Sequence, residues 1–138
     1  MSKTSSAARQ IAAWKVFAAE LVGTFVVVVA SATGSIVINA KAGGVLGTPF
    51  AAAAPAIAVA LMVYAFGRVS MAHFNPAVTA GFFVTGHVRA RQLPRYFAAE
   101  IAGALLASLF AGALVGPKAD LGANAPDYTY PGPLIIGI

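Results

Sequence analysis

Charged side chains are scarce in this 138-residue chain, and cysteine is absent. Lys, Arg, Asp and Glu together make up 9% of the residues, against about 25% in a typical soluble domain. Hydrophobic residues make up 59%. The shortage of charge excludes an ordinary soluble domain and predicts a small all-α integral membrane protein. The lack of cysteine excludes disulfides and thiolate chemistry, but it says nothing about the compartment.

The residue sets that enzymes need are also missing. The chain has four acidic residues and two histidines, and no nucleophile–base set or cluster of metal ligands can be recognised among them. We therefore expect no catalytic residue, no metal and no cofactor. The formal net charge of +5 is explained by membrane topology and contact with anionic lipid, so no nucleic-acid partner is expected.

Three apolar runs are long enough to cross a bilayer, which takes about 20 apolar residues. They divide the chain into an N-terminal segment (1–15), a membrane unit (16–116) and a tail (117–138) that turns apolar at its end, as if starting a truncated fourth span. The predicted spans cover about residues 16–38, 49–67 and 96–115.

The first run contains an acidic residue, Glu20. A basic start, an apolar stretch and Ala30-Ser31-Ala32 imitate a secretory signal, but the core of such a signal is only about 7–15 residues long. An ionisable residue inside a span is costly and is usually paired. We therefore predict a functional or architectural role for Glu20, with a snorkelling or merely paired carboxylate as the alternative.

A helix start lies inside the apolar sequence at Asn75-Pro76. Asn is a strong N-cap, and Pro is favoured as the first helical residue because its missing N–H would have no partner there. Gly86 then closes the helix. About ten residues at 1.5 Å each give roughly 15 Å, half of a hydrocarbon core roughly 30 Å thick. The sequence predicts a half-helix over residues 75–85 that reaches the midplane and stops.

Irregular backbone at membrane depth persists only where protein or a water-filled cavity surrounds it. The carbonyls before the half-helix should therefore line a path, and the positive helix end with the Asn75 amide should attract a passing oxygen and repel cations. An N-capped helix in a soluble protein would show the same Asn-Pro pair, but the flanking apolar runs favour the membrane. The predicted pore-lining carbonyls belong to Met71, Ala72, His73 and Phe74.

Small residues recur at a spacing of four along the third run, which favours close helix packing in lipid over alanine-rich filler. In the second run, Pro55 predicts at most a simple kink. The row of small residues comprises Ala99, Gly103, Ala107 and Ala111.

The basic residues are unevenly distributed between the connections. Seven lie before the first run or around the half-helix, and only Lys41 and Lys118 lie elsewhere. Cytoplasmic loops carry the excess, so we expect the N-terminus and the half-helix loop to be cytoplasmic. The same imbalance argues against copies inserted in both orientations. The seven are Lys3, Arg9, Lys15, Arg68, Arg89, Arg91 and Arg95.

Three stretches resemble the first half of the major intrinsic protein family, the aquaporins and aquaglyceroporins. They are Ala19-Glu20-Leu21-Val22-Gly23-Thr24-Phe25, residues 67–79 with His73-Phe74-Asn75-Pro76-Ala77-Val78-Thr79, and residues 98–104. The resemblance covers about residues 14–138. It implies a fold of two inverted repeats, each with three spans and one half-helix, of which this chain would supply the N-terminal repeat.

The resemblance also implies roles for single residues. Asn75 would donate to passing water or polyol at the midplane, while Pro76 and Ala77 pack against the cap of the other repeat. Glu20 would accept hydrogen bonds from the loop, and His73 would pack beside it, with a titrating gate as the alternative. The implied partners are the lipid bilayer and a complementary second half. The resemblance also implies that four channels form one assembly and that the assembly lies in the plasma membrane.

Some positions depart from the family's pattern. The chain has no second Asn-Pro-Ala and lacks the Arg that follows it, so half of the usual filter is absent. The aromatic filter position, twenty residues before Asn75, is Pro55. Glu100 stands where the family is expected to have Gln, and Arg91 or Arg95 are the nearest possible partners. The choice between water and glycerol therefore stays open.

Two classes of function remain. The first is a passive channel for water or small uncharged solutes, formed when this half meets a complementary half. The second is a non-conducting assembly or half-transporter subunit. The spans contain no basic residue and no carboxylate relay across the midplane, which favours the channel. We expect the chain to be a fragment or one half of a two-chain channel.

Overall fold

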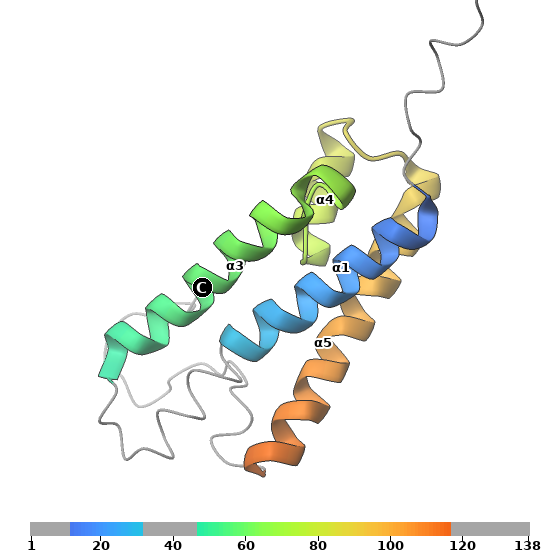
Figure 1. Ribbon diagram of the computed structural model, residues 1–138. Helices are drawn as coiled ribbons and strands as arrows, with labels where there is room; N and C mark the ends of the chain where they lie inside the picture. Colours follow the sequence, from blue (N-terminus) through green and yellow to red (C-terminus); the bar gives the residue numbers. More distant parts are fainter. Residues whose placement is uncertain (1–11, 32–46, 117–138) are drawn as a thin grey trace, which may run out of the picture.

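The structure describes residues 12–31 and 47–116 of the computed structural model, and these form helices joined by short connections, with no strand among them (Figure 1). Three long helices dominate, which confirms the predicted fold class. The elements are α1 (Ala13–Val28), α3 (Gly47–Ser70), α4 (Pro76–Val84), the short 3-10 helix η2 (Ala90–Gln92) and α5 (Leu93–Val115).

Several expectations fall on residues outside the described ranges. They concern most of the N-terminal segment, the end of the first span at 32–38, Lys41 and the tail with its fourth span. The described part of the first span continues past α1 to Ser31, and all three long helices are long and apolar enough to cross a membrane.

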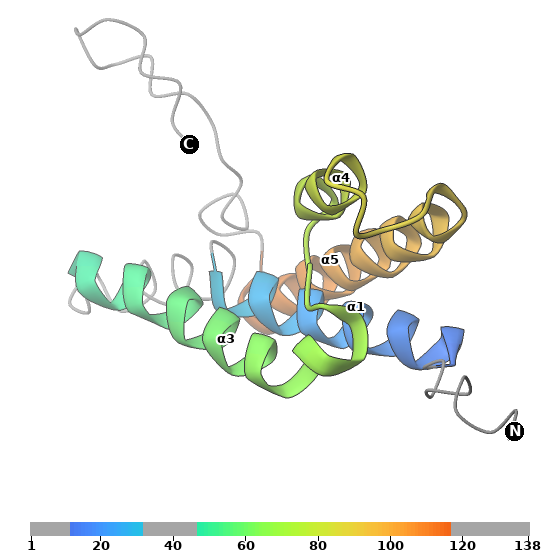
Figure 2. The same cartoon turned by 90° about the horizontal axis from the view of Figure 1, so that it is seen from above.

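Helix α1 is the central long helix, because it packs against both α3 and α5. After α3 ends, the chain turns back along the bundle, and α4 then returns toward the end at which α3 finished (Figure 1). Helix α4 packs on α5 and stands apart from α3 (Figure 2). The short helix α4 thus lies between the long helices α3 and α5 in the chain.

The contact between α1 and α5 depends on the row of small residues. Gly103 lies against the α1 backbone, and a Cβ built on it would be 2.6 Å from the carbonyl oxygen of Leu21. Ala99 and Ala107 are fully buried, and Ala111 is almost so. The predicted close approach of the third span is therefore confirmed, because at Gly103 even a Cβ would collide with α1.

Proline and glycine mark the ends of α5, and a proline lies within α3. Pro94 occupies the first turn of α5, and Gly116 ends the helix with a φ of 71°. This placement follows the usual preference for Pro at the first helical positions and Gly just past the last. Pro55 lies inside α3, which continues as one helix from Gly47 to Ser70.

Candidate functional site

The start of α4 is built around Asn75. Its backbone is extended, with φ −156° and ψ 128°, and its side-chain Oδ1 accepts a hydrogen bond of 2.8 Å from the Ala77 N–H. Its carbonyl accepts another of 3.0 Å from the Thr79 N–H. Pro76 follows as the first helical residue. The cap uses only the oxygen of the side chain, so the exposed Asn75 amide group keeps both N–H donors available to a ligand.

The loop before Asn75 has a rare backbone conformation. Met71, Ala72 and Phe74 have φ angles of 70°, 53° and 54°. Residues with a Cβ seldom adopt these values, because each costs about 1–3 kcal/mol and persists only where the surrounding structure imposes it. Within the described chain, the carbonyls of residues 71–74 accept no hydrogen bond. The conformation therefore leaves a row of acceptors without donors at an energetic cost, which is typical of a binding site.

Glu20 on α1 holds this loop in place. One of its carboxylate oxygens accepts a hydrogen bond of 3.1 Å from the His73 N–H, and the other accepts one of 2.7 Å from the Phe74 N–H. The Glu20 side chain has no exposed surface. Glu20 thus satisfies both of these N–H groups, while the carbonyls of the loop accept no hydrogen bond within the described chain.

The Phe74 side chain fits against α1 because of a glycine. A Cβ on Gly23 would lie 1.9 Å from the Phe74 ring, which no real contact allows. The same ring meets the edge of Phe66 at a centroid distance of 6.5 Å. Gly23 lies almost one helical turn after Glu20, so one segment of α1 accepts both the backbone and the side chain of the loop.

A chain of buried polar groups joins the loop to α5. The Thr79 hydroxyl donates to a carboxyl oxygen of Glu100, and the Nδ1 of His73 lies 2.7 Å from the Thr79 Oγ1. Because Thr79 has a single hydroxyl proton, the Nδ1 of His73 must be the donor in the second bond. The three side chains are buried, and Glu100 and Thr79 have no exposed surface.

This arrangement corrects the expected partner of Glu100. The sequence suggested Arg91 or Arg95, but Arg91 lies in η2 and Arg95 in the first turn of α5, and Glu100 bonds to Thr79 of α4 instead. The second carboxyl oxygen of Glu100 is buried without a partner in the described residues. Helix α5 turns Glu100 toward α4, whereas the arginines lie near the end of the bundle.

Aromatic rings enclose His73 from two sides. Its ring stacks on Tyr96 at a centroid distance of 4.6 Å and lies 4.4 Å from the ring of Phe82. The Tyr96 hydroxyl donates a bond of 2.8 Å to the Ser70 carbonyl at the end of α3. Sequence reasoning missed Thr79, Phe82 and Tyr96 as supports. The sequence signal for these supporting roles was weak, since only the helical spacing of the three residues relative to His73 and Glu100 could have indicated them.

The remaining predicted residues lie outside this cluster. Pro55 is partly buried within α3, about 22 Å along the helix axis from Ser70, and no hydrogen bond or ring contact joins it to the loop. His87 is an exposed loop residue, and its Nδ1 lies 3.0 Å from the Thr85 hydroxyl.

Comparison with known proteins gives a consistent result. The family described as Major intrinsic protein matches residues 7–130. Over 90 residues the chain is 46% identical to aquaporin NIP1-1 of Zea mays, a match covering 65% of this chain and 32% of the relative. Over 132 residues it is 38% identical to the probable aquaporin AqpM of Archaeoglobus fulgidus, covering 81% of this chain and 54% of the relative.

A third relative extends the comparison to another plant. The chain is 38% identical over 111 residues to the probable aquaporin NIP4-2 of Arabidopsis thaliana, which covers 79% of this chain and 39% of the relative. The chain thus spans about a third to a half of the length of the relatives that it matches.

Proposed function

The chain belongs to the major intrinsic protein family and is a multi-pass membrane protein; from this premise we propose that it forms half of a passive channel. The solute is water or a small uncharged molecule such as glycerol. Asn75 lies at the midplane and donates hydrogen bonds to the solute. Residues 16–116 form the half repeat, and residues 1–15 face the cytoplasm.

The observation that carries this proposal is the set of free polar groups at the start of α4. Four consecutive carbonyls, from Met71 to Phe74, accept no hydrogen bond in the described chain, and the Asn75 amide keeps its donors. Met71 is 40% exposed, and Asn75 is also exposed. A row of acceptors that ends at a donor can replace the hydrogen bonds that water loses on leaving bulk solvent.

The same geometry would exclude cations. The N-terminus of α4 carries about half a positive charge, and its field is strong in a medium of low dielectric constant. A water molecule that accepts from the Asn75 amide must direct its own protons away from Asn75. Its neighbours then cannot continue a single proton wire past this point, so protons are excluded while water passes.

A complementary half is needed to close the path. Within the described chain, helix α4 packs mainly on α5, and Val78, Phe83 and Val84 on α4 are exposed. A second repeat, on the same or another chain, would cover this surface, and Pro76 and Ala77 would meet its cap. Four such channels would assemble in the plasma membrane, as the resemblance implies.

Osmotic swelling of vesicles tests the proposal. The chain is co-expressed with the second half of the Archaeoglobus fulgidus relative, purified as a complex and reconstituted, and light scattering is followed by stopped flow. We expect water or glycerol permeability well above that of empty vesicles, together with a proton leak no larger than theirs.

A matched variant locates the effect. Asn75→Ala removes the donor and the cap, whereas His87→Ala changes an exposed residue near the other end of α4. Permeability should fall in the first and persist in the second. A stable complex whose permeability equals that of empty vesicles would refute the channel and favour a non-conducting assembly.

A further inference from the structure

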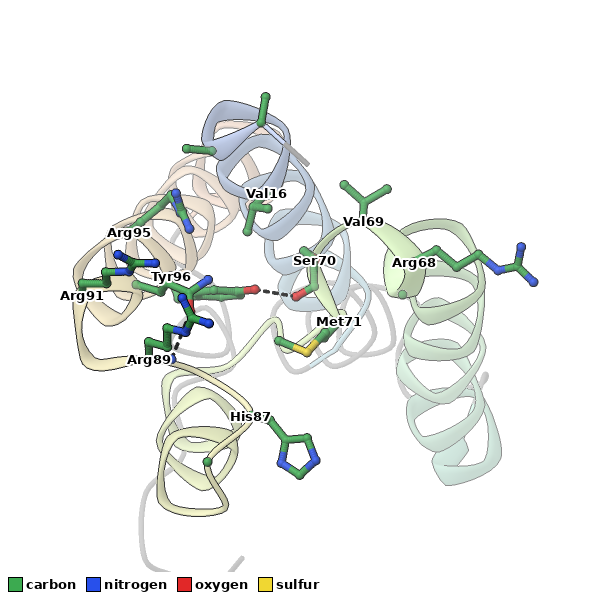
Figure 3. Close-up of a pocket in the computed structure, with 15 residues that line it drawn as sticks. Val16, Arg68, Val69, Ser70, Met71, His87, Arg89, Arg91, Arg95 and Tyr96 are labelled. Carbon is green, nitrogen blue, oxygen red and sulfur yellow. Dashed lines mark hydrogen bonds between the residues drawn. The ribbon is translucent and has the colours of Figure 1, made fainter. Parts of the chain in front are cut away.

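A hollow opens at the end of the bundle where α3 and α4 finish and where α1 and α5 begin. It has a volume of about 830 Å³ and opens to the outside of the protein. Its wall is formed by the first turn of α1, the end of α3, the turn after α4 and the start of α5 (Figure 3). Tyr96 and Ser70 also line it, and the Tyr96 hydroxyl donates a buried hydrogen bond to the Ser70 carbonyl.

Arginine dominates one side of this hollow. Arg89, Arg91 and Arg95 gather around Tyr96, whereas Arg68 extends away from them on the α3 side (Figure 3). The Nε of Arg95 is buried and has no hydrogen-bond partner in the described chain. Three guanidinium groups therefore share one side of a concave surface, and one of them has an unused donor that is already removed from solvent.

No carboxylate neutralises these arginines within the described residues. The acidic residues there are Glu20 and Glu100, which are both fully buried and bonded to the loop and to Thr79. Like charges brought together without a counter-ion repel one another, so an anion would stabilise the cluster. Arginine presents planar forks of N–H donors that match the oxygens of a phosphate group.

The hollow also lies at one end of the three helices that are long and apolar enough to cross a membrane. Trp14, which is 68% exposed, lies in the first turn of α1 beside Ala13, a residue of the wall. Exposed tryptophan is typical of the headgroup region, and basic pockets between membrane helices at that depth bind lipid headgroups. The end of the bundle that carries the arginines is therefore within reach of lipid phosphates.

We propose that this hollow is a phosphate-binding site in which Arg89, Arg91 and Arg95 recognise the anion. The phosphate belongs to a lipid headgroup of the adjoining leaflet or is free in solution. Neither source requires the channel to conduct, so the site can be tested by binding alone.

The single tryptophan of the chain provides the measurement. The full chain in neutral-detergent micelles is titrated with dansyl-labelled phosphatidylglycerol or dansyl-labelled phosphatidylcholine, and energy transfer from Trp14 is recorded. We expect the anionic lipid to bind at least about tenfold more tightly, since each arginine near an anionic surface contributes roughly fivefold. Inorganic phosphate is then added at constant ionic strength against chloride. Displacement of the lipid would show that free phosphate shares the site, and no displacement would assign it to headgroups alone.

Three variants separate a site from general surface attraction. Arg95→Gln should reduce the preference for phosphatidylglycerol about fivefold, and Arg68→Gln, which removes the same charge from the same end, less than twofold. Arg95→Lys keeps the charge but loses the planar fork, so it should also weaken binding. If Arg95→Gln does not fold, the exposed Arg89→Gln takes its place. Equal effects of the Arg68 and Arg95 variants, or no lipid preference in the unmodified chain, would overturn the proposal.

Discussion

Helices α3 and α5 are nearly equal in length, with 24 and 23 residues, yet they differ in what surrounds them. In the most apolar 18-residue stretch of each helix, 6% of the residues of α3 and 28% of those of α5 are buried within the described chain. On α3, Leu61 and Tyr64 are 58% and 91% exposed, whereas Ala99 and Glu100 on α5 have no exposed surface. Length and apolar character thus indicate that a helix can cross a membrane, but not which of its faces meets protein.

The difference follows from the small and polar residues. Helix α5 carries a row of small residues that allows α1 to approach closely. It also carries Glu100, which accepts a hydrogen bond from the Thr79 hydroxyl. Among the described residues of α3, the buried ones are Ala58 and Ser70. In lipid, close packing and hydrogen bonds associate helices, since the hydrophobic effect gives little preference for protein over lipid. The supporting side of the bundle is therefore α1 with α5, and α3 mainly delivers the chain to the loop.

The largest effect is expected from Glu20→Ala on α1, which should disturb the loop and leave α3 nearly unchanged. The change leaves the N–H groups of His73 and Phe74 without acceptors, and each costs about 1–3 kcal/mol. We expect hydrogen exchange at residues 71–75 to accelerate by two orders of magnitude or more (about 1.4 kcal/mol per factor of ten), while exchange in α3 changes little.

Glu20→Gln is the control for this change. It keeps one acceptor oxygen and the volume of the side chain, so exchange in the loop should rise much less. Unchanged protection of the loop in the Ala variant would show that another group holds it.

The second change is Thr79→Val, which keeps the shape but removes the hydroxyl, and its effect should not exceed that of Glu20→Ala. The Nδ1 of His73 and one carboxyl oxygen of Glu100 lose their partner together, at about 1–3 kcal/mol each. The contact between α4 and α5 should loosen, as measured by exchange across α4. Thr85→Val, at an exposed threonine that bonds to carbonyls of its own helix, should cost less than about 0.5 kcal/mol. Equal effects of Thr79→Val and Thr85→Val would show that the buried chain of His73, Thr79 and Glu100 does not hold α4 on α5.

The smallest of the three effects should come from Gly103→Ala on α5, with Gly67→Ala on α3 as its control. Gly103→Ala places a methyl group 2.6 Å from the Leu21 carbonyl, and overpacking of this kind costs about 1–3 kcal/mol. Gly67→Ala on α3 meets nothing within 4 Å and should be neutral or slightly stabilising. Unfolding in a denaturing detergent measures both. A loss of stability in the α3 variant as large as that in the α5 variant would contradict the distinction between the two helices.

Local chemistry made part of this structure predictable from sequence. Asn75 and Pro76 mark the start of α4 by capping rules that depend only on neighbouring residues, and spacing alone identified the row that contains Gly103. Glu20 was singled out because a carboxylate in an apolar run needs a partner.

Other features depend on contacts that spacing does not define. The partner of Glu100 depends on the rotation of α5 against α4, so the nearby arginines were a wrong choice. The positive φ of Phe74 accompanies its hydrogen bond to Glu20 and the packing of its ring on Gly23, which lie far away in the sequence. Nothing in the residue types of Met71, Ala72 and Phe74 favours such angles. Tyr96 joins His73 to the end of α3 only after the helices have assembled.

The central claim is that solute passes along the loop carbonyls and the Asn75 amide, and one pair of variants tests it most directly. In the reconstituted complex of this chain with a complementary half, osmotic permeability per channel is compared between Asn75→Leu and Leu61→Ala. Asn75→Leu replaces the donor with an apolar group of similar length, whereas Leu61→Ala changes an exposed residue of α3. We predict that permeability falls at least fivefold (on the order of 1 kcal/mol, the net value of one hydrogen bond) in the first variant and is unchanged in the second. Equal permeability in the two variants would contradict the account.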